Sequence, residues 1–413
     1  MQLDFMPLPS EKRLAIRVTK QAEQAIRQGH PWVFASAIQS PAKEGKSGDL
    51  AVIFDRKRRF LAIGLYNPTS PIRVRILHSG SPITIDDSWF ADHLRKTISK
   101  RDPLLSTNTN GYRLVSGEND GLPGLVIDRY ADTCVLKLYT PAWVPHLRSI
   151  VPPLLEETQA KRVVLRMSRA VQKEVDTLHG LSDGMILHGD ALDGPVIFLE
   201  NGLRFEADPI VGQKTGFFLD QRDNRARVEQ LVVQEQAHDV LNVFAYTGGF
   251  SLYAARGGAS RVTSLDISKP ALAAAERNFA LNHDQPNIAH VHHEILAADA
   301  FKALSEMARS GKQFDMVIID PPAFAKKQNE IEGALSAYAR LTKLGLRVTK
   351  KGGTIVLASC SSRVDADTFF NTIREAARQS RRPMKELSRT GHALDHSIGF
   401  PEGAYLKCLF AKV

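Results

Sequence analysis

Residues 239–266, near the middle of the chain, restrict the fold more than any other stretch. An apolar run ends abruptly in Thr247-Gly248-Gly249, a small-residue helix pattern follows, and a second apolar run stops at Asp266. This order predicts a strand, a turn whose glycines let backbone approach a ligand, a helix, a second strand and a carboxylate. A carboxylate about 20 residues beyond such a turn can accept hydrogen bonds from both hydroxyls of a ribose.

The spacing of the glycines distinguishes between a dinucleotide and a simpler nucleoside cofactor. A dinucleotide site uses G-x-G-x-x-G, which cradles a pyrophosphate, and this turn lacks that spacing. A nucleoside cofactor without a pyrophosphate, S-adenosylmethionine, fits better. We therefore expect it to bind Tyr246, Thr247, Gly248, Gly249 and Asp266.

Strand and helix patterns alternate from residue 239 to the end of the sequence. Such alternation predicts an α/β fold, a mostly parallel sheet with helices on both faces. Ligands of these sheets bind beyond the carboxyl ends of the strands, so the residues after each strand are site candidates. The expected strands are 240–244, 262–265, 288–292, 316–319, 354–358, 384–388 and 405–412, and the expected helices are 250–256, 271–282, 300–310 and 331–348.

Two further carboxylates follow predicted strands. Asp299 comes after the third, where it could accept a hydrogen bond from an adenine amino group. Asp320 follows the fourth, in Asp320-Pro-Pro-Ala-Phe324. The prolines make that turn rigid, so they hold the Asp320 carboxylate and the Phe324 ring in place. We expect Asp320 at the cofactor and at the edge of a nucleobase, with Phe324 stacking on the face of that base.

A cysteine, Cys360, follows the fifth predicted strand at the same edge as Asp320. Thiolates are strong nucleophiles, which makes Cys360 the candidate for covalent catalysis, whereas Cys134 and Cys408 are expected to pack inside the protein. Carbon 5 of a pyrimidine needs such help, because only thiolate addition at carbon 6 makes it nucleophilic enough to accept a methyl group. The target base must lie in a loop or be extruded from a duplex.

A loop before the sheet, residues 212–225, combines glycines, aromatic residues and charges. A purely structural connection rarely has so many functional side chains close together, so we expect the loop to face the cofactor. The residues expected there are Lys214, Thr215, Asp220, Gln221 and Arg222.

The N-terminal part of the chain is basic. Residues 1–80 contain 13 Lys/Arg and 6 Asp/Glu, which accounts for seven of the nine net positive charges. Short strand patterns over residues 13–80 predict a small barrel, whose interior Trp32 and Phe34 are expected to fill. A hairpin tip would present Arg56, Lys57, Arg58 and Arg59 to RNA phosphates.

The rest of the composition describes an ordinary globular protein. At roughly 100–200 residues per domain, 413 residues predict two or three domains. No apolar run could span a membrane, and no signal peptide is evident, so we expect no membrane partner. The three cysteines are too far apart in sequence for a disulfide framework or a metal site, which favours a reducing cytoplasm.

Together these motifs resemble one known family, the PUA-domain-containing 23S rRNA cytosine-5 methyltransferases. The resemblance covers essentially the whole chain and is carried by His30-Pro-Trp-Val-Phe34, the stretches 117–124, 212–222 and 244–250, Asp320-Pro-Pro-Ala-Phe324, Ser359-Cys-Ser361 and Pro401-Glu-Gly-Ala-Tyr405. It implies a PUA-like β-barrel domain (1–80), a central α+β domain with its linker (81–205) and a Rossmann-like class I methyltransferase domain with a seven-stranded sheet (206–413). It also implies S-adenosylmethionine as methyl donor and 23S rRNA or a large-subunit precursor as partner, and it supports Cys360 as nucleophile.

The chain departs from related proteins in two places. Small-subunit cytosine-5 enzymes have a Pro-Cys motif after the fourth strand, where this chain has Pro321-Pro322. Another group or water must therefore assist release from the adduct. Family members commonly have Lys where this chain has Ala323, so a contact to RNA or cofactor is in doubt.

Other interpretations of the sequence remain open. A guanine N7 or amino-group methyltransferase would need no thiol, and a non-catalytic RNA-binding assembly factor would need no cofactor. The sequence does not identify the modified nucleotide. An aromatic-rich N-terminal surface could support a homodimer.

Overall fold

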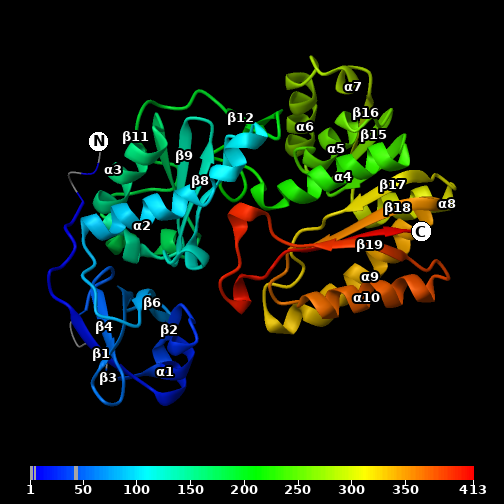
Figure 1. Cartoon of the computed structure of the whole chain (residues 1–413). Helices are drawn as coiled ribbons and strands as arrows, with labels where there is room; N and C mark the ends of the chain where they lie inside the picture. Colours follow the sequence, from blue (N-terminus) through cyan, green and yellow to red (C-terminus); the bar gives the residue numbers. More distant parts are fainter. Residues whose placement is uncertain (1–2, 4–5, 41–44) are drawn as a thin grey trace. The chain divides into compact units, whose positions relative to one another are not determined.

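The computed structural model of the chain describes residues 3, 6–40 and 45–413 (Figure 1). Its contacts group the chain into two compact units. Unit 1 contains Met1–Gly202, Ala207–Leu219 and Leu394–Gly403, and unit 2 contains Leu203–Glu206, Asp220–Ala393 and Ala404–Val413. The division into three domains at residues 80 and 205 stays a prediction. Within the described ranges, no helix is both long enough and apolar enough to cross a bilayer.

Unit 1 begins with a six-stranded sheet in the order β2-β6-β5-β4-β1-β3. Strand β1 alternates buried and exposed residues, so it faces a core on one side. Strand β5, two strands away in this order, is buried along most of its length because Leu61 packs in the small core of the module and Ile63 in the larger core of unit 1. Among the described residues α1 is the only α-helix between these strands, and Thr19 caps its N-terminus. The strands are β1 (Leu14–Val18), β2 (Trp32–Phe34), β3 (Ile38–Ser40), β4 (Leu50–Phe54), β5 (Phe60–Tyr66) and β6 (Ile72–Ser79), and α1 is Lys20–Arg27.

The prediction that Trp32 and Phe34 fill the interior of this module is wrong. Side chains alternate along a strand, and in β2 the residue that points inward is Val33, which is 1% exposed. Phe34 is 44% exposed. Trp32 is half-buried, and its indole N–H donates to Glu118 at 2.9 Å.

The basic hairpin tip between β4 and β5 has the exposure that the sequence predicts. Asp55 is buried and organises the turn by accepting the backbone N–H groups of Lys57 and Arg59 at 2.8 and 2.9 Å. The side chains of Arg56, Lys57, Arg58 and Arg59 are exposed. Asp4, Lys43 and Glu44, which also enter the charge count, lie outside the described residues.

The remainder of unit 1 is built on a five-stranded sheet in the order β11-β10-β9-β8-β7. Helices α2 and α3 pack together, and the fully buried Trp143 belongs to the core between helices and sheet. Strand β12 then pairs with β13, of which Leu203–Glu206 belong to unit 2, and Asn201 and Gly202 between the two strands have positive φ as the predicted hairpin requires. The elements are α2 (Asp87–Ser99), β7 (Gly111–Ser116), β8 (Leu125–Tyr130), β9 (Thr133–Leu138), α3 (Leu147–Thr158), β10 (Arg162–Met167), β11 (Ile186–His188), β12 (Val196–Glu200) and β13 (Leu203–Ala207).

Unit 2 is built on a seven-stranded sheet in the order β16-β15-β14-β17-β18-β20-β19. The first five strands are parallel, and β20 is antiparallel to both of its neighbours. Helices α4 to α6 contact one another on one face, and α8 to α10 do so on the other (Figure 1). The predicted mostly parallel sheet is confirmed. The strands are β14 (Asp239–Val243), β15 (Arg261–Asp266), β16 (His292–Ala297), β17 (Phe314–Ile319), β18 (Thr349–Ser359), β19 (Lys385–Thr390) and β20 (Lys407–Lys412), and the helices are α4 (Arg222–Glu235), α5 (Gly249–Arg256), α6 (Lys269–Leu281), α7 (Pro286–Ala289), α8 (Ala300–Arg309), α9 (Ile331–Val348) and α10 (Ala366–Gln379).

One predicted strand, residues 288–292, is placed too early. Pro286 begins a short helix, α7, which suits the fixed φ of proline, and Ile288 packs inward from that helix. The strand β16 starts only at His292, which pairs with Arg261 of β15. It therefore ends at Ala297, two residues before Asp299.

Candidate active site

The turn between β14 and α5 has an unusual backbone. Phe244, Tyr246 and Gly248 all have positive φ, of 62°, 49° and 76°. A Cβ atom at Gly248 would lie 2.8 Å from the Cβ of Ala275, so only glycine fits there. Non-glycine residues at positive φ are strained, and such strain gathers at ligand sites.

Asp266, the last residue of β15, is fixed beside this turn. Its Oδ2 accepts the backbone N–H of Tyr246 at 2.9 Å, and its Oδ1 accepts that of Ser268 at 2.8 Å. Each carboxylate oxygen has a second lone pair, so the half-buried group can still accept the two hydroxyls of a ribose. The geometry therefore suits the role predicted for Asp266.

Thr247 provides a test of whether a polar ligand fits the turn. Its hydroxyl Oγ1 is buried and has no hydrogen-bond partner among the described residues, while its carbonyl accepts Asn278 Nδ2 at 2.9 Å. An unsatisfied buried hydroxyl is costly, and a bound polar molecule would remove that cost. Gly249 begins α5, where a Cβ atom would come within 3.0 Å of the Arg225 side chain. The turn thus fits a nucleoside ligand such as S-adenosylmethionine.

Asp299 has an identified structural partner. Its Oδ1 accepts the backbone N–H of Lys302 at 3.0 Å and caps helix α8. It lies just beyond the end of β16, where the sequence places it, and its contact with adenine stays a prediction.

Asp320 and Gln221, predicted from separate motifs, lie together. Gln221 Nε2 donates to Asp320 Oδ2 at 2.9 Å, and Gln221 Oε1 in turn accepts Asn224 Nδ2 at 2.5 Å. Sequence patterns gave no reason to choose Asn224, because it lies inside a helix. Phe324 is half-buried with its ring centroid 5.2 Å from that of Tyr338, so part of its surface already packs against the protein.

Cys360 comes directly after β18, and its half-buried thiol donates to the carbonyl of Pro321 at 3.8 Å. The thiol therefore lies against the Asp320-Pro-Pro turn that follows β17. Burial raises the pKa of Cys134 to about 11 and that of Cys408 well above its usual range. Both are fully buried, which confirms their predicted packing role.

Comparison with known families agrees with this geometry. A family described as S-adenosylmethionine-dependent methyltransferase matches residues 176–387, a little over half of the chain, and a PUA-like domain matches residues 16–79. The chain belongs to the S-adenosylmethionine-dependent methyltransferases. The predicted cofactor and the PUA-like N-terminal domain are confirmed.

Curated relatives of this methyltransferase match along the full chain. A ribosomal RNA large subunit methyltransferase of Deinococcus radiodurans is 48% identical over 412 residues, which are 98% of this chain and 99% of the relative. Ribosomal RNA large subunit methyltransferase I of Vibrio parahaemolyticus is 38% identical over 97% of this chain and 99% of its own. The chain is thus a member of the family of large-subunit ribosomal RNA methyltransferases.

Solved structures share the fold. A protein of Streptococcus mutans assigned to the S-adenosylmethionine-dependent methyltransferases superposes with a TM-score of 0.79 at 23% identity, covering 97% of this chain and 100% of that one. A second methyltransferase structure, SMU.776 in complex with S-adenosylhomocysteine, gives a TM-score of 0.80 at 22% identity and the same coverage.

The loop 212–225 of the methyltransferase is divided between the two units. In unit 1, Thr215 is buried, donates to Asp128 at 2.6 Å and is hydrogen-bonded to Tyr130 at 3.0 Å. The Nζ atom of Lys214 lies 4.4 Å from the ring centroid of Phe218, and the carbonyl of Lys214 accepts a hydrogen bond from Lys137 Nζ. These contacts give both residues a structural role, and their contact with the cofactor stays a prediction.

The other predicted residues of this loop belong to unit 2. Asp220 accepts the hydroxyl of Tyr405 at 2.9 Å, and Arg222 is buried at the start of α4. Tyr405 was not predicted as a site residue, although it lies in one of the motifs that carry the family resemblance.

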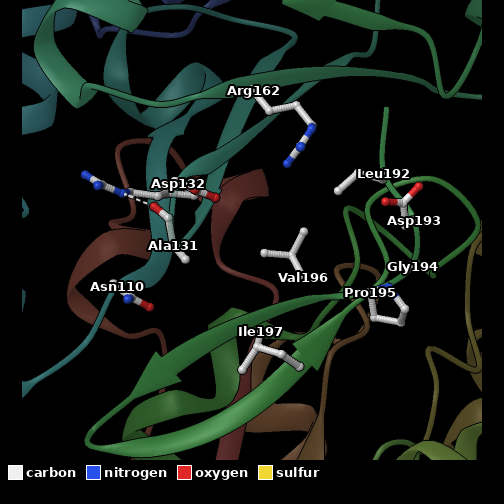
Figure 2. A pocket seen from close by; sticks show the side chains of 11 residues that line it. Asn110, Ala131, Asp132, Arg162, Leu192, Asp193, Gly194, Pro195, Val196 and Ile197 are labelled. Atoms are coloured by element: carbon white, nitrogen blue, oxygen red, sulfur yellow. Dashed lines mark hydrogen bonds between the residues drawn. The ribbon is translucent and has the colours of Figure 1, made fainter. Parts of the chain in front are cut away.

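A separate open cavity of about 820 Å³ lies in unit 1 and contains none of the predicted residues (Figure 2). Its arginines already have partners: Arg129 donates to the carbonyl of Ala131 at 2.8 Å, and Arg162 to that of Asp190 at 2.6 Å. Asp132 and Asp193 add negative charge to the lining. The mixed charges do not favour one class of ligand.

Proposed function

We propose that the protein transfers a methyl group to carbon 5 of a cytosine in 23S rRNA through a covalent Cys360 adduct. The observation that carries the proposal is the position of the Cys360 thiol, 3.8 Å from the carbonyl of Pro321 and so beside Asp320. The names of the full-length relatives support large-subunit rRNA as the substrate.

Each side chain has a defined task in this reaction. The Cys360 thiolate adds to carbon 6 of the cytosine, and the electron pair of the 5,6 double bond becomes available at carbon 5. Asp320 accepts a hydrogen bond from the 4-amino group at the N3/N4 edge of the ring and so holds the base in place for the addition. S-adenosylmethionine, when bound, supplies an electrophilic methyl group. After carbon 5 is methylated, its proton leaves to water or a base, the double bond re-forms, and the carbon–sulfur bond breaks to return the Cys360 thiolate.

Residues away from the reacting atoms have binding roles in this proposal. The exposed part of the Phe324 ring can stack on the extruded base. Arg56, Lys57, Arg58 and Arg59 are exposed and can neutralise phosphates without reading sequence. A cytoplasmic location and a homodimer stay predictions.

The experiment that tests the proposal replaces Cys360 by alanine. We expect Cys360→Ala to lose methyl transfer to 23S rRNA by at least about 1,000-fold, because the variant cannot activate carbon 5. Its affinity for S-adenosylmethionine, measured by calorimetry, should be unchanged. Cys408→Ala, which removes the neighbouring buried thiol of β20, is the matched control and should remain active.

The products identify the chemistry and the site. Mass mapping of rRNA from a strain that lacks the protein should show one missing 5-methylcytosine. Full activity of Cys360→Ala, or a missing methyl group on guanine, would overturn the thiol mechanism in favour of N7 or amino-group transfer. Absence of cofactor binding in the wild-type protein would favour the non-catalytic alternative.

A further inference from the structure

Lys407, the first residue of β20, is a buried cation next to the proposed nucleophile. It pairs with Ser359 across the antiparallel β18–β20 ladder, one residue before Cys360. The residue is 3% exposed. Its Nζ donates to the carbonyls of Ser361 at 2.5 Å and Val364 at 2.6 Å. The ammonium therefore lies beneath the short segment that carries Cys360.

A buried ammonium is unfavourable unless an opposite charge compensates it. Both hydrogen bonds of Lys407 within the described part of the chain go to neutral carbonyls. Burial lowers the pKa of Lys407 to about 8, and the groups that oppose this shift are the Cys360 thiolate and the Asp365 carboxylate. A hydrophobic residue would pack at this position without that cost, so the charge itself needs an explanation.

We propose that Lys407 is a positioning residue whose ammonium stabilises the thiolate form of Cys360 and ties down the loop that follows it. This inference rests on the proposed function only in taking Cys360 as the nucleophile. The positive charge of Lys407 favours ionisation of the Cys360 thiol, and this matters because only the thiolate attacks.

The other titratable groups around Cys360 cannot replace Lys407 in this role. Asp320 carries a negative charge, which opposes ionisation of a nearby thiol. Tyr338 donates or accepts a hydrogen bond with Ser359 at 2.8 Å, and burial raises its pKa to about 12, so it is neutral. Asp365 caps helix α10 and is also negative. Among these groups Lys407 provides the positive charge.

Three variants separate charge from packing. Lys407→Arg keeps the charge, Lys407→Gln keeps N–H donors for the two carbonyls without charge, and Lys407→Met keeps only the apolar stem. Alkylation of the protein by iodoacetamide across pH reports Cys360, because Cys134 and Cys408 are fully buried, and Cys360→Ala gives the background. Lys412→Met, which removes a half-exposed lysine of the same strand, is the matched control.

We expect the midpoint pH of alkylation to rise by roughly one to two units in Lys407→Gln and Lys407→Met. It should stay within a few tenths of a unit of wild type in Lys407→Arg and Lys412→Met. Unchanged midpoints in folded Lys407→Gln and Lys407→Met would overturn the proposal. A raised midpoint in Lys407→Met but not in Lys407→Gln would also overturn it, because Lys407 would then act through its hydrogen bonds and not through its charge. The measurement needs no RNA, so it stands even if the cytosine assignment fails.

A reciprocal measurement covers the case in which the lysine variants do not fold. The attraction is mutual, so removing the thiolate must make Lys407 easier to deprotonate. With ¹³Cε-labelled lysine, the Lys407 resonance should titrate at a lower pH in Cys360→Ser than in wild type. An identical titration in the two proteins would overturn the proposal.

Discussion

The two halves of the candidate site are built in different ways. In the cofactor half, at the ends of β14 and β15, the carboxylate of Asp266 accepts backbone N–H groups from Tyr246 and Ser268. All of these residues lie within the stretch 239–268. In the acceptor half, at the ends of β17 and β18, Asp320 is held by Gln221, and the loop after Cys360 is held by Lys407.

The comparison shows two ways of fixing a polar group at a strand end. The cofactor half is fixed by the backbone, through positive φ at Phe244, Tyr246 and Gly248. The acceptor half is fixed by side chains from elements far apart in the sequence. We therefore expect the cofactor half to be sensitive to backbone changes, and the acceptor half to change its chemistry when single side chains are replaced.

Among the changes that test this comparison, the largest effect on cofactor binding should come from Asp266→Ala. Its carboxylate can accept two ribose hydroxyls, and each hydrogen bond to a charged group contributes about 1.5–3 kcal/mol. The affinity for S-adenosylmethionine, measured by calorimetry, should fall by roughly 100-fold or more. Unchanged affinity would remove Asp266 from the ribose site.

A matched carboxylate at the opposite end of the same sheet controls for lost backbone contacts. Asp315 also accepts two backbone N–H groups, those of His238 and Asp239, at 3.1 and 2.9 Å. Asp315→Ala should lower stability and leave cofactor affinity near that of the wild type. Equal losses of affinity in the two variants would mean that the effect is structural.

Gly248→Ala tests the backbone side of the comparison. The new Cβ atom would meet Ala275 at 2.8 Å while the residue keeps a φ of 76°, so we expect a loss of about 2–3 kcal/mol in the free energy of unfolding. Gly311 has a similar φ of 72° with open space around it, and Gly311→Ala should cost only about 1 kcal/mol. Urea unfolding measures both, and equal costs would contradict the packing argument.

Acid should lower the free energy of unfolding through His293, which lies on β16 beside the cofactor half. Its Nε2 is hydrogen-bonded to Ser264 at 2.8 Å, and burial together with the neighbouring His292 lowers its pKa to about 4. The unfolded chain takes up this proton first, so stability is lost as pH falls from about 6.5 towards 4. Because the side chain is partly exposed, we expect His293 to account for about 2 kcal/mol of this loss in the free energy of unfolding. His293→Phe should show a correspondingly smaller loss between pH 7 and pH 4.5 in urea unfolding, and equal losses would contradict the assignment.

The cofactor half was easier to predict from the sequence than the acceptor half, because it is built from one continuous stretch. The cofactor turn is local, so glycine spacing and an acid after the second strand predict Thr247, Gly248 and Asp266 as candidates, and the hydrogen bond from Tyr246 to Asp266 shows that the acid lies beside the turn. The closeness of Cys360 to the turn that begins at Asp320 was predictable because parallel strands end at a common edge. Lys407 and Asn224 were not, since each lies inside a regular element and gains its role only from pairing across the sheet or from a helix packed beside it.

The smallest effect should come from Gln221, which joins the loop 212–225 to the acceptor half. Gln221→Leu keeps the size of the side chain but removes the N–H donor that orients Asp320 at 2.9 Å. A hydrogen bond to a charged group of this kind is worth about 1.5 kcal/mol at the lower end, so methyl transfer should slow by roughly tenfold. Cofactor affinity should change little if Gln221 acts through Asp320. Gln230→Leu, which replaces an exposed glutamine of α4, the helix that begins just after Gln221, should have no effect. Loss of cofactor affinity in Gln221→Leu would instead place this glutamine in the cofactor half, because its contact with Asp320 would then be secondary to one with the methyl donor.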